Sequence, residues 1–267
     1  MARAMSLRPM GILEIVDQSF RLYRSSFLVF FGIAAVVYVP VQVVQSIPVV
    51  GTFAVVAYLP LMLIANAALT KAVSDRYLGE ESSIGVAYSA IGKRFWPLVG
   101  TTIIAYLFML SGVILLGVGM IVFWFWIAFV AQVFVIEDKR YLAAVWRSRF
   151  LIGKGVWGEF LVLMIIVGVL TSIIQGAVGA VFGAPAYFLG RGEQVVTSPL
   201  VLLAFGLVQS LVLPIGQAAA VLLYYDSRIR KEGFDLEMLA REMGMAPARP
   251  APAAPAGATP PDPGKPV

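Results

Sequence analysis

The chain has 267 residues, of which 60% are hydrophobic and only 13% are charged, and its mean hydropathy is +0.89. A soluble domain usually carries about 25% charged residues, so this composition excludes an ordinary soluble protein and indicates one surrounded mostly by lipid. The chain contains no cysteine and no histidine, which excludes disulfides, thiolate chemistry and histidine-based catalysis. Its formal net charge of +5 is spread over short segments between apolar runs, so nucleic acid is not an expected partner.

The first predicted element is an amphipathic helix over residues 9–24, ahead of the first apolar run. Its apolar residues share one helical face: Ile12, Ile15, Val16, Phe20 and Tyr23. This pattern favours a helix that lies in the plane of the lipid headgroups. Segments 82–94 and 139–155 have a similar pattern, and Ser82 or Ser83 is a suitable N-cap for the second of the three.

Six apolar segments follow, each long enough to cross the hydrocarbon core of a membrane, which takes about 20 residues. None has a charged residue in its interior, and the segments are 27–47, 49–70, 98–115, 117–136, 160–182 and 199–225. The predicted fold class is therefore an all-α integral membrane protein with six transmembrane helices, forming one polytopic domain over residues 1–245. Residues 246–267 are rich in alanine and proline and are expected to be a disordered tail.

The distribution of basic residues predicts the orientation of these spans. Of the 20 lysines and arginines in the chain, all but Arg191 lie in the two terminal segments or in the second-to-third and fourth-to-fifth connections. Basic residues concentrate on the cytoplasmic side of membrane proteins. Both termini are therefore predicted to be cytoplasmic.

The same segments suggest an internal repeat. Basic residues and then an aromatic residue follow each amphipathic segment, at 21–27, 93–96 and 154–157, and a pair of apolar segments comes next. The returning segments each contain an amide in a similar place, at Asn66, Gln132 and Gln217. We therefore expect three hairpin repeats with cytoplasmic interfacial helices, inserted in parallel and related by an axis along the membrane normal.

Asn66, Gln132 and Gln217 are also the candidate intramembrane site. The simpler interpretation is that they form hydrogen bonds between helices, which contribute on average about 0.6 kcal/mol per pair. The alternative is that the three amides converge on an axial cavity that binds a polar headgroup. No ionisable residue lies inside a predicted span, which argues against proton- or sodium-coupled transport.

No catalytic constellation is found in the sequence. The carboxylates lie at or beyond the predicted membrane surfaces, and adjacent pairs such as Glu80-Glu81 would point in different directions on a helix. The chain contains no HExxH, GxSxG, phosphate-loop or zinc spacing. We therefore expect no catalytic residue, no metal site, no cofactor and no enzymatic activity.

The end of the last span carries the most distinctive motif, YYDSRIRKEGFDLE at 224–237. Cations of this kind attract anionic headgroups by about 1 kcal/mol each. Together with earlier surface residues, this motif supplies the predicted headgroup or partner contacts: Arg21, Arg24, Lys93, Arg94, Tyr225, Asp226, Arg228 and Arg230. Combined with PMGILEIVDQSFRLYR at 9–24, the motif resembles bacterial proteins of the glycerophosphoryl diester phosphodiesterase membrane-domain family, over roughly residues 9–243.

The resemblance implies a multi-pass protein of the bacterial plasma membrane. Family members exist in which such a region precedes a soluble phosphodiesterase domain, and many others consist of the membrane region alone. The catalytic domain has no counterpart here, so its activity is not assigned to any residue of this chain. The leading expectation is a non-enzymatic scaffold or accessory subunit that engages lipid or a partner membrane protein. The alternatives are a transporter or permease for an amphiphilic, lipid-like substrate and, third, a membrane-embedded lipid enzyme.

Overall fold

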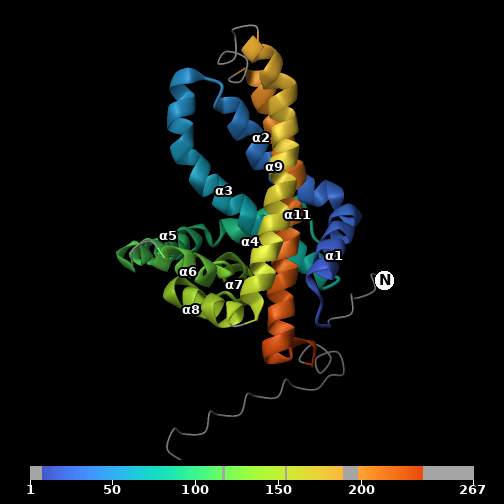
Figure 1. Cartoon of the computed structure of the whole chain (residues 1–267), viewed down its shortest axis with the longest axis vertical. Helices are drawn as coiled ribbons and strands as arrows, with labels where there is room; N and C mark the ends of the chain where they lie inside the picture. Colours follow the sequence, from blue (N-terminus) through green and yellow to red (C-terminus); the bar gives the residue numbers. More distant parts are fainter. Residues whose placement is uncertain (1–7, 116–117, 154, 189–197, 237–267) are drawn as a thin grey trace, which may run out of the picture.

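A computed structural model of the chain describes residues 8–115, 118–153, 155–188 and 198–236, and these residues fold into ten α-helices and one short 3-10 helix (Figure 1). In chain order they are α1 (Ile12–Ser25), α2 (Phe27–Val44), α3 (Pro48–Tyr77), α4 (Ile84–Gly92), α5 (Phe95–Ser111), the 3-10 helix η1 (Gly112–Leu115), α6 (Val118–Trp126), α7 (Val130–Glu137), α8 (Tyr141–Ile152), α9 (Val156–Phe188) and α11 (Pro199–Glu232). The predicted tail at 246–267 lies outside the described residues.

Five stretches of these helices are long and apolar enough to cross a membrane: Phe27–Val44, Phe95–Ile114, Gly119–Glu137, Val156–Phe182 and Pro199–Glu232. The prediction of an all-helical protein with several membrane-spanning segments is thus confirmed. The second predicted span, 49–70, falls within α3, which is helical over 30 residues but is not among these five stretches. Neither the six-span topology nor the threefold hairpin repeat is shown.

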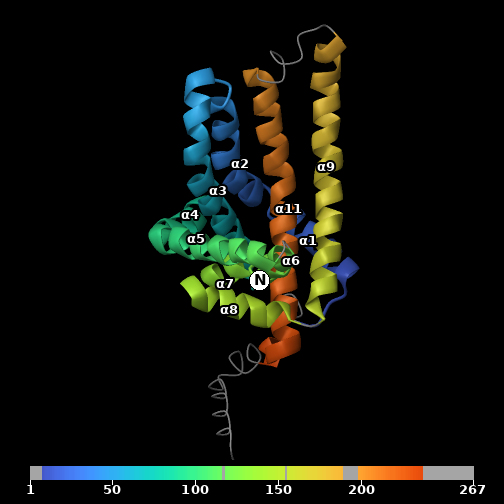
Figure 2. The same cartoon turned by 60° about the vertical axis from the view of Figure 1, so that its left-hand side comes forward.

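The helices run in two directions. Helices α2, α3, α9 and α11 follow the long axis of the molecule, whereas α5, α6, α7 and α8 lie across it, and two views turned by 60° agree on this (Figures 1 and 2). The hairpin of α5 and α6 is therefore oriented differently from the hairpin of α2 and α3. We call the four helices α5, α6, α7 and α8 the crosswise layer. In both views this layer lies toward the end of the molecule where α11 finishes.

Helix α11 is the central packing element, in contact with α1, α2, α3, α8 and α9. Its 34 residues extend over about 51 Å, well beyond a hydrocarbon core of about 30 Å. Gly206 allows the closest approach to α2, because a Cβ atom there would lie 3.1 Å from the Val39 Cα and 3.2 Å from the Tyr38 carbonyl oxygen. Small residues let membrane helices pack this closely.

Each predicted amphipathic segment contains a helix, namely α1, α4 and α8. The Ser83 side chain caps α4 by accepting a hydrogen bond of 3.4 Å from the Val86 amide. Helix α4 is anchored to α2 by the Tyr88 hydroxyl, which donates to the Ile33 carbonyl at 2.6 Å, and burial raises the pKa of Tyr88 to about 12. In α1 the buried residues include Ile15 and Leu22, so part of its apolar face packs on the protein.

The predicted span 117–136 is interrupted by a turn at residues 127–129, between α6 and α7. The backbone amide of Phe129 donates a hydrogen bond to the Ser148 hydroxyl of α8 at 3.0 Å, so it has a partner outside its own helix. A break in a membrane helix is tolerated where such partners are available or where the backbone lines a cavity. This turn does line a cavity, as described next.

Candidate functional site

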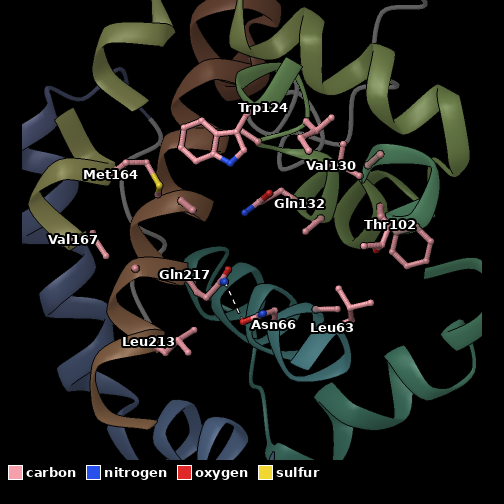
Figure 3. A pocket seen from close by; sticks show the side chains of 18 of the residues that line it. Leu63, Asn66, Thr102, Trp124, Val130, Gln132, Met164, Val167, Leu213 and Gln217 are labelled. Atoms are coloured by element: carbon pink, nitrogen blue, oxygen red, sulfur yellow. Dashed lines mark hydrogen bonds between the residues drawn. The ribbon is translucent and has the colours of Figure 1, made fainter. Parts of the chain in front are cut away.

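A pocket of about 490 Å³ lies between α3, α5, α6, α7, α9 and α11 (Figure 3). Its walls are mostly apolar, with Trp124, Met164 and Leu213 among the side chains drawn, and Ile127 and Ala128 of the helix break also face it. A volume of this size is within the usual range for small-molecule sites, about 300–1,000 Å³. The pocket is therefore large enough for a ligand and has the apolar character of a lipid-like one.

The structure brings the three predicted amides together. Asn66 of α3, Gln132 of α7 and Gln217 of α11 all line this pocket (Figure 3). Gln217 Nε2 donates to Asn66 Oδ1 at 3.2 Å, and the Tyr38 hydroxyl donates to the same oxygen at 3.4 Å. Two of the amides thus form an interhelical hydrogen bond, as the first interpretation expects. All three line one pocket, and the binding of a polar headgroup there stays a prediction.

Gln132 differs from the other two amides. It is only 3% exposed, and its Oε1 atom is buried without a hydrogen-bond partner among the residues that the structure describes. Figure 3 shows the amide extending toward the middle of the pocket, between Trp124 on one side and Asn66 and Gln217 on the other. Leaving a buried acceptor unpaired costs about 1–3 kcal/mol. A ligand that donates a hydrogen bond to this oxygen would therefore be favoured.

The threonine hydroxyl groups around the pocket are already engaged. Thr101, Thr102 and Thr171 each donate to the carbonyl four residues earlier in their own helix, at 2.7, 2.9 and 2.7 Å. Thr101 Oγ1 also accepts the amide hydrogen of Tyr141 at 2.9 Å, which ties α5 to α8. The protons of these threonine hydroxyls are therefore not available to a ligand. The Tyr106 hydroxyl and the amides of Gln175 and Gln209 also line the pocket, so they join Asn66, Gln132 and Gln217 as its polar groups.

The pocket is electrically neutral. None of the described residues that line it carries a formal charge. Transfer of an ionised group into such surroundings is very unfavourable unless a counter-charge accompanies it. The site therefore suits a molecule with a long apolar body and a small uncharged polar group.

A separate ionic network joins α7, α8 and α11; we call Glu137, Arg147, Tyr224, Arg228 and Glu232 the Glu137 cluster. Glu137 accepts hydrogen bonds from Arg147 Nε and from the Tyr224 hydroxyl, both at 2.7 Å, and Arg147 also donates to Glu232 at 2.7 Å. Burial acts to lower the pKa of Arg147, but its hydrogen bonds with Glu232 and Glu137 outweigh burial and raise it. The hydrogen bonds of the cluster thus connect α7 and α8 of the crosswise layer to α11.

The predicted headgroup contacts divide into two groups. Arg21, Arg24 and Lys93 are exposed, and Arg94 forms a partly exposed ion pair of 3.3 Å with Asp138. These four side chains are therefore accessible at the surface.

The four residues of the C-terminal motif are instead engaged within the protein. Tyr225 and Asp226 are completely buried, and the Tyr225 hydroxyl lies 2.6 Å from Ser74 Oγ of α3. Arg228 contacts Glu232 at 3.2 Å, and Arg230 lies 2.9 Å from Glu159. The motif serves to join α11 to its neighbours, and its geometry favours a structural role over headgroup binding.

Two features of the site had no counterpart in the sequence analysis. Tyr38 was treated as part of an apolar span, although its hydroxyl reaches Asn66, and the Glu137–Arg147 pair joins residues ten positions apart. The tyrosine was detectable, because a buried tyrosine hydroxyl usually finds a partner. Among the described residues no group of three or more aspartates and glutamates lies close enough to hold a metal ion.

The fold and the pocket define a multi-pass helical membrane protein with an internal, mostly apolar site. No protein-family model, no curated protein and no solved structure matches the chain. The assignment of function therefore depends on the site itself.

Proposed function

We propose that this protein is a non-enzymatic, multi-pass protein of the bacterial plasma membrane that binds an amphiphilic, lipid-like molecule in the pocket between α3, α7 and α11. The observation that carries the proposal is the meeting of Asn66, Gln132 and Gln217 at one uncharged pocket of about 490 Å³. An apolar cavity with a few convergent polar groups is the usual form of a ligand site. The resemblance to the glycerophosphoryl diester phosphodiesterase membrane-domain family is compatible with this role and remains a proposal.

Lipid engagement suits a scaffold or accessory subunit. The exposed cations Arg21, Arg24 and Lys93 provide a surface for anionic headgroups, at about 1 kcal/mol for each. Exposed aromatic side chains on the crosswise layer, including Trp96 at 78% and Trp146 at 52% exposure, offer contacts to lipid or to a partner membrane protein. Aromatic residues of this kind are enriched both at membrane interfaces and in protein contacts.

Transport of the bound molecule is the second candidate function. It is favoured by the break between α6 and α7, whose residues Ile127, Ala128 and Val130 face the pocket. Discontinuous helices commonly form the substrate sites of secondary transporters. A transporter would release the ligand on both sides of the membrane, whereas a scaffold or accessory subunit would retain it.

Filling the pocket should abolish ligand retention. Ala131 lines the pocket, so Ala131→Trp places a large ring in the space that the ligand would occupy. The matched control, Val169→Trp, alters a residue of α9 that is 53% exposed and is not part of the lining. We expect native mass spectrometry of protein extracted from its membrane to detect a bound lipid in the wild type and in Val169→Trp, but not in Ala131→Trp. Wild-type protein without retained lipid, or equal retention in all three, would refute the proposed function.

We further propose that both termini are cytoplasmic. Two arrangements of the hairpin of α5 and α6 are compared. The hairpin either spans the membrane, as in the predicted six-span topology, or lies across the long axis as in Figure 2. In both arrangements the chain crosses the membrane an even number of times, so its two ends lie on the same side. The two arrangements differ in where the hairpin tip lies. In the six-span topology the tip is external, and in the crosswise arrangement it stays on the side of the membrane where α11 ends.

Cysteine labelling separates these topologies, because the chain has no cysteine of its own. With an impermeant maleimide on intact cells, we expect Ser198→Cys to react and Ser89→Cys to react only after permeabilisation. Ile114, at the hairpin tip and 84% exposed, decides the arrangement. We expect Ile114→Cys to remain unlabelled in intact cells, and its labelling would instead establish six spans. Labelling of Ser89→Cys in intact cells would reverse the orientation.

A further inference from the structure

The unpaired oxygen of Gln132 specifies what the ligand must supply. Asn66 Oδ1 already accepts from Tyr38 and Gln217, and Thr101, Thr102 and Thr171 donate to their own helices. Gln132 Oε1 is buried and has no hydrogen-bond partner within the described part of the chain. The terminal torsion of a glutamine side chain is broad and roughly two-fold, so rotation of the amide about this bond can turn the oxygen toward a ligand. The ligand group that meets it must be a hydrogen-bond donor.

Charge narrows the choice of donor. An ammonium group would donate well, but none of the described lining residues is a carboxylate that could balance its charge. A phosphate would bring a negative charge and further acceptors, and no lysine or arginine is found among the described lining residues to receive them. Buried charges in proteins are paired or coordinate metals. A charged headgroup is therefore disfavoured, and a neutral donor is required.

A hydroxyl group meets these conditions. It can donate to Gln132 Oε1 and also accept from a neighbouring amide N–H, because an alcohol oxygen has both functions. The rest of the wall consists largely of aliphatic and aromatic side chains such as Leu63, Phe160 and Met164, which suit a hydrocarbon chain. Burial of that chain would contribute roughly 0.8 kcal/mol per CH₂.

We propose that the ligand is a neutral lipid alcohol, meaning a long-chain molecule with an uncharged hydroxyl headgroup such as a monoacylglycerol, and that Gln132 is the residue that selects it. This inference rests on the proposed function, because it names the class of molecule that the pocket holds. It assigns different roles to the three amides. Asn66 and Gln217 hold α3 and α11 together through their own hydrogen bond, while Gln132 accepts a hydrogen bond from the hydroxyl group of the ligand.

Tryptophan fluorescence provides a local test, because Trp124 lines the pocket beside Gln132 (Figure 3). The other four tryptophans are replaced by phenylalanine, and the protein is reconstituted into nanodiscs. The probes are a monoacylglycerol with a dibrominated chain and a phosphatidylglycerol with the same chain. Bulk lipid around Trp124 gives quenching that rises steadily with mole fraction. Occupancy of the pocket adds a component that saturates at low mole fraction.

We expect saturable quenching with the monoacylglycerol and only the steady component with phosphatidylglycerol. Gln132→Leu should raise the half-saturating mole fraction roughly 2- to 10-fold, the range that one hydrogen bond supplies. Gln45→Leu, the same substitution on a residue outside the pocket lining, should leave it unchanged. Because Gln132→Leu removes an unpaired buried acceptor, its thermal midpoint should equal or exceed that of the wild type, whereas a structural role for the amide would lower it.

The remaining outcomes separate the two proposals. Equal saturation by phosphatidylglycerol, or saturable quenching that is unaffected by Gln132→Leu, would overturn the lipid-alcohol inference and leave the proposed function standing. Absence of saturation with either probe, together with the absence of retained lipid in the mass-spectrometric experiment, would overturn both. Saturation by the monoacylglycerol that weakens only in Gln132→Leu supports both.

Discussion

Replacing Glu137 by alanine should lower the free energy of unfolding by about 1.5–3 kcal/mol, the range for a hydrogen bond to a charged group, because Arg147 keeps Glu232 as a second partner. Glu137 is 11% exposed and its partner Arg147 is 16% exposed. The substitution also leaves the fully buried Tyr224 hydroxyl without the carboxylate that accepts its hydrogen bond at 2.7 Å. The measurement is unfolding by SDS in mixed micelles, followed by circular dichroism.

The neighbouring carboxylate is the control for this effect. Asp138 is 49% exposed and pairs with Arg94 and Arg140 at 3.3 Å, so Asp138→Asn should change stability by only about 0–1 kcal/mol. Asparagine is chosen because the backbone φ of Asp138 is +53°, a conformation that asparagine tolerates. Equal effects of Glu137→Ala and Asp138→Asn would show that the Glu137 cluster does not hold the crosswise layer to α11.

Much of the helical content was predictable, because long uncharged apolar runs in a membrane permit little else. The first, third, fourth, fifth and last predicted spans each overlap one of the five long apolar stretches of the structure. The three amides were recognisable for a related reason, since polar side chains are rare and costly inside apolar segments. Their similar positions in the chain indicated a common location, and Asn66, Gln132 and Gln217 do line one pocket.

The direction of the middle helices was not predictable from the same information. The hydrophobicity of a segment indicates only that its side chains avoid water. A helix along the long axis and a helix across it can both bury those side chains, so hydrophobicity does not predict the direction. The turn at 127–129 contains neither glycine nor proline, so no local signal marks it. Its stability comes from tertiary contacts, such as the hydrogen bond from the Phe129 amide to Ser148, which residue patterns along the chain do not reveal.

The C-terminal motif illustrates a related ambiguity. Tyrosines and arginines at the end of a span suit an aromatic belt and anionic headgroups. In the structure Tyr224 and Tyr225 are both fully buried and bond to Glu137 and Ser74 respectively. The last turns of α11 bond to residues of α3, α7 and α8, so residues typical of a membrane interface become internal contacts.

Asp226 makes the most far-reaching of these contacts, with the segment that precedes α1. It is fully buried and accepts the backbone amide hydrogen of Met10 at 2.7 Å. Arg230 Nε lies 2.7 Å from the other carboxylate oxygen, although that oxygen has no aligned hydrogen bond, so this contact is an ion pair. Asp226 therefore holds the start of the chain to α11, the helix that also lines the pocket.

Asp226→Ala should loosen α1, since it leaves the buried Met10 amide without its acceptor, while Arg230 keeps Glu159 as a partner. Ser19 is a suitable reporter, because it is fully buried on α1 and the chain has no other thiol to compete with Ser19→Cys. We expect Asp226→Ala to raise the labelling rate of this cysteine on the order of 100-fold, as local opening becomes less costly. The control is Asp17→Ala, which removes an exposed carboxylate of the same helix and should leave the rate unchanged. An unchanged rate in Asp226→Ala would mean that apolar packing alone, through residues such as Ile15, holds α1 in place.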